Sequence, residues 1–119
     1  MEVKPVTMES CIEFALTFPG AVADAPFDED TIVLRHRDSR KWFGLLIHVH
    51  GVPCINLKCD PQQADFYRHV YRNVTPAYHM NKTHWNTIVL DGDVPEGELQ
   101  EMIAHSYALT ASRRSKKLC

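Results

Sequence analysis

The apolar positions at the start of the chain recur with the spacing of an amphipathic helix over residues 8–16. This stripe consists of Met8, Cys11, Ile12, Ala15 and Leu16. Thr7 stands where a threonine side chain can cap the first turn, and Pro19 with Gly20 is expected to stop the helix. The pattern therefore predicts a short first helix, followed by a loop rich in acidic residues.

Three closely spaced segments then alternate apolar and polar positions with the period of two that is typical of strands. They are residues 31–36, 41–50 and 54–59. Strict alternation in the longest segment places Phe43 and Leu45 on one face and Gly44 and Leu46 on the other. Connections this short cannot form a parallel crossover, which needs about a dozen residues or more, so we predict an antiparallel meander.

The next part of the chain predicts a helix, a loop and a strand. Asp60 and Pro61 are typical of an N-cap followed by a first helical position, and this helix is expected to end at about Tyr71. Residues 72–84 are predicted to form a long irregular loop, which is unusual in a small domain and often functional. Residues 85–90 have the pattern of a fourth strand.

A last helix is expected from about Pro95, with Asp93 and Glu96 at capping-box spacing. Its apolar stripe consists of Leu99, Met102, Ile103, Ser106 and Thr110. The residues that follow it, 112–119, are basic and are expected to fray as a C-terminal tail.

These elements predict one α+β domain over residues 1–119 that contains an antiparallel meander. A hydrophobic content of 45% and a charged content of 24% are ordinary for a globular protein. No apolar stretch approaches the roughly 20 residues that a bilayer requires, and the N-terminus does not resemble a signal peptide. We therefore expect a cytoplasmic protein with no membrane partner, whose four cysteines are reduced thiols.

Charge is distributed unevenly along the chain, although the formal net charge is only −2. Residues 1–30 hold seven acidic residues and one basic residue, whereas residues 31–59 hold five basic residues and one acidic residue. The overall balance argues against a strongly basic nucleic-acid binder. It leaves room for one local basic face on the meander.

Several sequence blocks resemble those of the MmcQ/YjbR family, in the family's order and across nearly the whole chain. They are Pro19-Gly20-Ala21, Pro26-Phe27, Lys41-Trp42-Phe43, Asn56-Leu57-Lys58-Cys59-Asp60-Pro61, the stretch from Pro76 to Asn86, Leu90-Asp91-Gly92 and Ser106-Tyr107. The resemblance implies a CyaY-like α+β fold, in which helices back a curved antiparallel sheet. It also implies DNA binding through a winged arrangement of strands and loops. It implies no catalytic activity and no cofactor.

Two groups of residues are the candidates for such a contact face. The basic group on the meander comprises Arg35, Arg37, Arg40, Lys41 and Lys58, and the loop group comprises His79, Asn81, Lys82 and His84. Arginines at a hairpin tip suit bidentate contacts to phosphate, and the aromatic residues Tyr78 and Trp85 suit stacking on an unpaired base. The leading hypothesis is therefore a non-enzymatic DNA-binding domain, with weak and mainly backbone-directed binding.

Each group also has a structural interpretation. The basic side chains can form a solvated face that balances the acidic first third, and polar loop residues can satisfy their own backbone while Trp85 fills the core. A second functional hypothesis is a module that binds a small anion, a peptide or a protein. It would use the loop over residues 76–85 and the open face of the sheet.

Two further patterns carry less weight. His48 and His50 lie two apart on a predicted strand, but two imidazoles do not make a metal site, and no metal is expected. Cys59 precedes the N-cap Asp60, where the positive end of a helix favours a thiolate but the neighbouring carboxylate opposes one. An enzyme that uses Cys59 as its nucleophile is the third hypothesis.

Overall fold

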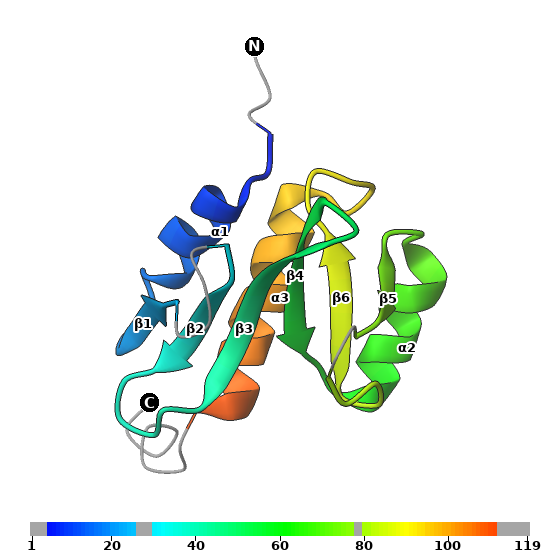
Figure 1. Ribbon diagram of the computed structural model, residues 1–119. Coiled ribbons are helices and arrows are strands. Elements are labelled where there is room, and N and C mark those ends of the chain that lie inside the picture. The colour runs from blue at the N-terminus through cyan, green and yellow to red at the C-terminus, as the bar shows by residue number, and fades with distance from the viewer. Residues whose placement is uncertain (1–4, 26–29, 78–79, 112–119) are drawn as a thin grey trace.

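The computed structural model describes residues 5–25, 30–77 and 80–111. Six strands form one antiparallel sheet in the order β1-β2-β3-β4-β6-β5 (Figure 1). The strands are β1 (Ala21–Asp24), β2 (Ile32–His36), β3 (Trp42–Val49), β4 (Val52–Lys58), β5 (Val74–Pro76) and β6 (Trp85–Val89). Because β2, β3 and β4 follow one another in the sheet, the predicted meander of three strands is confirmed.

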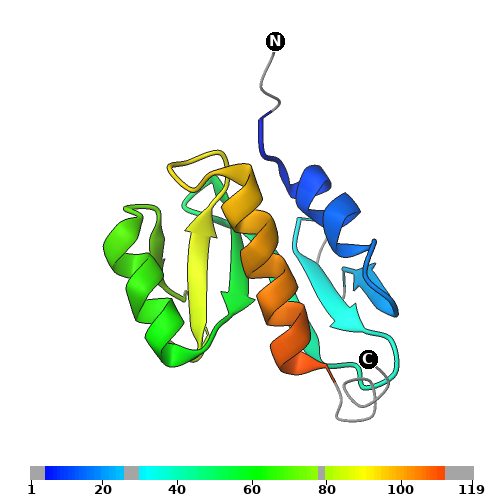
Figure 2. The same ribbon diagram turned by 180° about the vertical axis from the view of Figure 1, so that it is seen from behind.

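The helices are α1 (Met8–Ala15), α2 (Pro61–Val70) and α3 (Glu96–Thr110). They cover one face of the sheet, as the two opposite views together show (Figures 1 and 2). The core between the layers contains Leu34, Leu46, Ile55 and Ile88 from the strands, packed against helical residues such as Ile103. The molecule is thus an α+β fold with an antiparallel sheet backed by helices.

The predicted helix starts are confirmed for α1 and α2. Thr7 and Ser10 form a capping box, in which the Ser10 backbone N–H donates to Thr7 Oγ1 at 3.0 Å. Asp60 Oδ1 accepts from the backbone N–H of Gln62 at 3.1 Å, and Pro61 occupies the first helical position.

The start of α3 near Pro95 is confirmed, but the capping box predicted for Asp93 and Glu96 is wrong. Pro95 is its N-cap and makes no side-chain hydrogen bond to the first turn. The Asp93 carboxylate instead accepts from the backbone N–H groups of Arg72 and Asn73, at 2.7 and 3.1 Å. Asp93 therefore ties the β6–α3 turn to the end of α2, a contact between distant segments that local spacing cannot reveal.

Two short edge strands were missed. β1 lies in what was predicted to be an acidic loop, and β5 lies within the predicted irregular loop over residues 72–84. Each is only a few residues long, so neither has enough positions for a period of two to be recognised. Both are formed by pairing with a neighbour, β1 with β2 and β5 with β6.

Strict alternation fails in β3. The register between β2 and β3 shifts at Leu34 and Arg35, which pair with Gly44 and Trp42 respectively. Phe43 is the extra residue of this irregularity, and it packs in the helix-side core together with Leu46, not with Leu45. A bulge of this kind depends on the partner strand and leaves no signature in the alternation of β3 itself.

The face of the sheet without helices is less open than expected at its centre. Val33 and Asn56 on this face are both 0% exposed, and Thr87 Oγ1 donates to Asn56 Oδ1 at 2.6 Å. Among the described helices, none has the length and apolar character needed to cross a bilayer. His79 and the predicted tail over residues 112–119 lie outside the described residues.

Candidate functional site

Asp24 at the end of β1 pairs with two of the arginines that were predicted to contact nucleic acid. Its Oδ2 accepts from Nε of Arg35 at 3.0 Å and from Nη2 of Arg40 at 3.4 Å. The Arg35 side chain is only 16% exposed, and its guanidinium also lies 5.5 Å from the centre of the Trp42 ring. Arg35 is thus held on two sides. The Arg40 side chain is 58% exposed, and its surface ion pair with Asp24 costs little to break when a ligand binds.

The tip of the β2–β3 hairpin presents Arg37 and Lys41 to solvent. The backbone N–H of Arg37 donates to the carbonyl of Gly20 at 2.7 Å, which fixes the tip to the start of β1. Arg40 has a φ of 64° and its N–H donates to the carbonyl of His36 at 2.9 Å, which closes the turn. The predicted hairpin tip is therefore a short turn that is tethered to the start of β1.

The described part of the polar loop has a clear structural role. Asn81 Oδ1 accepts from the backbone N–H groups of Thr83 and His84, at 2.9 and 3.2 Å. Lys82 Nζ donates to the carbonyl of Ala77 at 2.9 Å, and Arg68 donates to the carbonyl of Lys82. Asn81 and Lys82 thus build the turn that leads into β6, while the His84 side chain is exposed.

A groove of about 340 Å³ lies at the end of the sheet where β3 and β6 begin and where β4 and α3 end, the lower end in the view of Figure 1. The described residues that line it are Lys41, Trp42, Lys58, Met80, Trp85, Leu109 and Thr110. They include two lysines and two tryptophans but no carboxylate. Of the predicted contact residues, the groove brings together Lys41 and Lys58.

The pairing of the strands shows how the residues on the two sides of this groove are arranged. Lys58 at the end of β4 is the direct cross-strand partner of Trp85 at the start of β6. Opposite positions on neighbouring antiparallel strands have their Cβ atoms about 4.5–5.5 Å apart, so these two side chains leave the sheet together. Trp42 and Lys41 approach from the start of β3, on the other side of β4.

A buried hydroxyl fixes the backbone beneath the groove. Ser106 Oγ on α3 accepts from the backbone N–H of Lys58 at 2.9 Å and donates to the carbonyl of Phe43 at 2.6 Å. One side chain therefore joins α3 to β3 and β4 where both strands reach the groove. The neighbouring N–H of Cys59 donates to the carbonyl of His84 at 2.7 Å, which holds β4 to the start of β6.

His36 contacts one of the residues that line the groove, Thr110. Its Nε2 lies 2.8 Å from Oγ1 of Thr110, a groove residue, and its ring packs against Phe43 and Tyr107. Burial lowers the pKa of His36 below its usual 6.5, while the nearby Asp38 carboxylate acts in the opposite direction. At neutral pH the imidazole is therefore uncharged and serves as a packing and hydrogen-bonding group.

Sequence reasoning missed part of the groove. Trp42 was assigned only to a strand face, and Met80 and Leu109 were not singled out. Trp85 was weighed as a stacking residue and as a core residue, and it proves to be half-buried beside Lys58. The pairing of a lysine with a tryptophan in the Lys41-Trp42 block was a signal that could have directed attention here.

The thiol of Cys59 is poorly suited to nucleophilic chemistry. Burial, reinforced by the neighbouring Asp60 carboxylate, raises its pKa to about 11. At neutral pH almost none of it is thiolate. Cys54 is also buried, and its pKa is likewise raised by burial.

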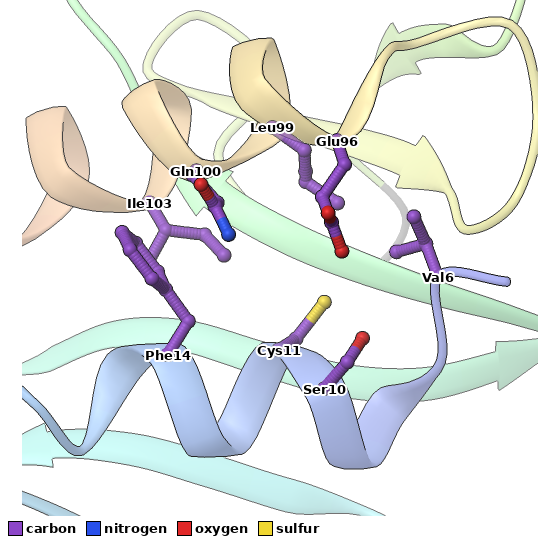
Figure 3. Close-up of a pocket in the computed structure, with 8 residues that line it drawn as sticks. All are labelled: Val6, Ser10, Cys11, Phe14, Glu96, Leu99, Gln100 and Ile103. Carbon is purple, nitrogen blue, oxygen red and sulfur yellow. The ribbon is translucent and has the colours of Figure 1, made fainter. Parts of the chain in front are cut away.

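A second hollow, between α1 and α3, is lined by Cys11 and Glu96 among others (Figure 3). Its volume of about 10 Å³ is near that of one probe sphere, so it has no room for an organic ligand. Burial raises the pKa of Cys11 to about 12. Within the described ranges, no group of three His, Cys, Asp or Glu side chains is arranged to hold a metal ion.

The strand order and the helices on one face define an α+β protein with an open antiparallel sheet. The chain belongs to the YjbR family, whose model matches residues 16–109.

Two bacterial proteins of this kind are similar to the chain over most of its length. The uncharacterized protein YyaQ of Bacillus subtilis is 38% identical over 103 residues, covering 76% of this chain and 86% of YyaQ. The uncharacterized protein YjbR of Escherichia coli is 28% identical over 102 residues, covering 86% of this chain and 85% of that protein.

Crystal structures of two bacterial proteins have the same fold. One, from Pseudomonas syringae, is 31% identical with a TM-score of 0.81, and the match covers 88% of this chain and 99% of that one. The other, a Deinococcus radiodurans protein with a DUF419 domain, is 26% identical with a TM-score of 0.83, over 99% of this chain and 91% of that one.

Proposed function

We propose that this domain binds nucleic acid, DNA in the first instance, without catalysing a reaction, and that the groove between Lys41, Lys58 and Trp85 is the contact site. The observation that carries the proposal is the convergence of two ammonium groups and an accessible indole on a hollow whose described lining has no carboxylate. Lysines neutralise phosphates, and aromatic rings stack on bases. Nucleic acids present both groups at every nucleotide.

The proposal moves the contact site away from the arginines of the hairpin. Arg35 is held by Asp24 and by the Trp42 ring, so it contributes little charge to a ligand. Arg37 and Arg40 extend the positive surface from Lys41 along the hairpin tip, where they can reach phosphates outside the groove. Because few cations take part, binding is expected to be weak at physiological salt and strong only at low salt.

A binding role without a covalent step agrees with the chemistry of the described cysteines, which are buried thiols with raised pKa values. We expect the domain to work in the cytoplasm, where such thiols stay reduced.

The direct test is a fluorescence-anisotropy titration with labelled DNA at several salt concentrations. Replacing Lys41 with glutamine should weaken binding and reduce the slope of log affinity against log salt by about 1, because one phosphate contact is lost. The matched control is Arg72→Gln, which removes one exposed positive charge at the junction of α2 and β5. Equal effects of the two substitutions, or no binding at low salt, would refute the proposal.

A second candidate function is supported by the size of the groove. Its volume of about 340 Å³ falls at the lower end of the roughly 300–1,000 Å³ typical of small-molecule sites. A small organic anion with an aromatic ring would suit the same lining. Thermal unfolding distinguishes the two: saturable stabilisation by a small anion, with no response to oligonucleotides, favours the small-molecule site.

A further inference from the structure

We infer that the groove takes an unpaired nucleotide of a single strand, with its base against Trp85 and its phosphates near Lys58 and Lys41. This inference rests on the proposed function and specifies which form of nucleic acid the site selects. It follows from the rigidity of Trp85, from the positions of the lysines, and from the poor fit of a duplex.

Trp85 is a fixed platform. Its backbone N–H donates to the carbonyl of Asn81 at 3.0 Å, and its own carbonyl accepts from the N–H of Ala77 at 3.0 Å. The residue is therefore anchored on both sides by the turn that Asn81 and Lys82 build. These hydrogen bonds fix the backbone of Trp85, and half-burial restricts its indole, so stacking on a base costs less side-chain entropy than it would for a fully exposed ring.

Both lysines lie on the same side of this platform, because Lys58 on β4 stands between Trp85 on β6 and Lys41 at the start of β3. Lys58 is directly opposite Trp85 across the β4–β6 ladder, and its backbone is fixed by the Ser106 hydroxyl. Lys41 lies at the base of the exposed hairpin tip and lines the same groove. A strand whose base rests on Trp85 and which continues across the end of the sheet towards β3 thus meets Lys58 first and Lys41 next, and each can neutralise a phosphate.

A duplex suits the same site poorly. Its bases are stacked inside, and only their edges are accessible, through grooves that admit a helix or a two-stranded ribbon. The three described helices cover the other face of the sheet (Figure 2), and only the end of α3 reaches the groove, through Leu109 and Thr110. The hairpin arginine Arg35 is paired with Asp24. The apolar groove residues Met80 and Leu109 would meet no complementary surface on a duplex.

The size of the groove limits what enters it. A volume of about 340 Å³ is near the small end of ligand sites, and one nucleotide unit is the occupant that we assign to it. Neighbouring nucleotides would lie outside the groove, along the hairpin tip. Recognition is then expected to depend on an available base face and on phosphate charge, with little dependence on sequence.

The test uses three labelled DNA probes of about ten nucleotides, a length within the usual range of single-strand sites. They are a single strand, the same strand annealed to its complement, and a single strand of equal charge that lacks its bases. The intact single strand is expected to bind most tightly, and Trp85→Ala should weaken its binding about five-fold or more, while leaving the affinity for the base-free strand unchanged. Trp85→Phe should restore most of the affinity, with circular dichroism confirming the fold of each variant.

The outcomes separate the inference from the function on which it rests. If the duplex binds as tightly as the single strand, or if the base-free strand matches the intact one, the single-strand inference is wrong while nucleic-acid binding stands. If none of the three probes binds at low salt, both fall.

Discussion

Asp24 controls how much of the positive charge on the first hairpin is available to a ligand. The sequence shows acidic residues in the first third and basic residues on the meander, but it does not show which of them meet. The fold brings Asp24 onto the strand beside β2, within hydrogen-bonding distance of Arg35 and Arg40. The sequence suggests an uninterrupted basic segment on this hairpin, but Asp24 on the neighbouring strand β1 neutralises part of its charge.

Replacing Asp24 with asparagine is therefore expected to strengthen nucleic-acid binding. Releasing Arg40 should add one phosphate contact and steepen the slope of log affinity against log salt by about 1. The control is Asp65→Asn on α2, which changes the net charge equally but removes only a partner of His69. If both substitutions steepen the slope by the same amount, the effect is one of overall charge, and the pairing with the arginines is irrelevant.

His36 makes the stability of the fold depend on pH. Burial is the main cause that lowers its pKa from 6.5, and the nearby Lys41 lowers it further. Asp38 and a hydrogen bond with the backbone of Tyr107 raise the pKa, and Thr110 is a further hydrogen-bond partner of the ring. The unfolded chain takes up a proton near 6.5, whereas the folded chain does so only at lower pH. The contribution of His36 is therefore present in full above about pH 6.5 and decreases as the pH falls towards the lowered pKa.

Denaturant unfolding at about pH 7.5 and pH 5.5 measures this effect. The wild-type protein should lose stability between the two, and His36→Gln, although less stable at the higher pH, should lose less. His84→Gln alters an exposed imidazole and should behave as the wild type does. An unchanged pH dependence in His36→Gln would show that other groups are responsible.

At the scale of elements, the junction of α3 with β3 and β4 builds the groove. Leu99, Met102 and Ile103 pack α3 onto the sheet, and Ser106 adds a polar connection within that buried face. The sequence predicts that Ser106 faces the core, because it lies on the helical stripe. It does not predict that the hydroxyl satisfies two backbone groups on different strands.

Ser106→Ala should destabilise the protein by about 1–3 kcal/mol, because the Lys58 N–H and the Phe43 carbonyl are left without their partner in a buried place. Chemical denaturation gives the value. Ser39→Ala at the exposed hairpin tip serves as the control and should stay within about 0.5 kcal/mol of the wild type. A loss for Ser106→Ala as small as that of the control would mean that the bridge contributes little.

How far the sequence predicts the elements depends on where the determining contacts lie. The caps of α1 and α2 are local, so Thr7 and Asp60 could be identified from the sequence. β1 and β5 exist because longer strands pair with them, and the irregularity at Phe43 depends on the register with β2. These features are tertiary, and no local pattern encodes them.

The same distinction applies to the candidate site. Lys41 and Lys58 were predicted from their charge. The other lining residues, Trp42, Met80, Leu109 and Thr110, belong to the groove only because the starts of β3 and β6 meet the ends of β4 and α3 there. Asn81 and Lys82 were predicted as contact residues, and their hydrogen bonds show that they support the backbone of the turn. Residue type alone could not separate these two roles.

At the scale of the whole molecule, the groove lies beside the point where the described chain ends. Leu109 and Thr110 line the groove, and the sequence continues after Ala111 with Arg113, Arg114, Lys116 and Lys117. Four cations thus follow in the sequence within seven residues of Thr110. Their contribution to binding would be electrostatic and independent of sequence.

Ending the chain after Ala111 should weaken nucleic-acid binding and flatten the salt dependence, by as much as about one unit of slope per cation that contacts phosphate. The melting temperature should remain close to that of the full chain, because the core elements are retained. A full-length variant with the four cations replaced by glutamine should reproduce the binding loss. If the truncated chain binds like the full one, the tail takes no part.

The most direct test of the account is a backbone and indole NMR titration with a short single-stranded DNA. The chain has two tryptophans, and both line the groove, so their indole N–H signals report on the site. We predict saturable shifts of the Trp85 indole and of the Lys41 and Lys58 amides, with α1 and the outer face of α2 unaffected. Shifts centred on the exposed Phe66 and Val70 of α2, or no shifts at low salt, would contradict the account.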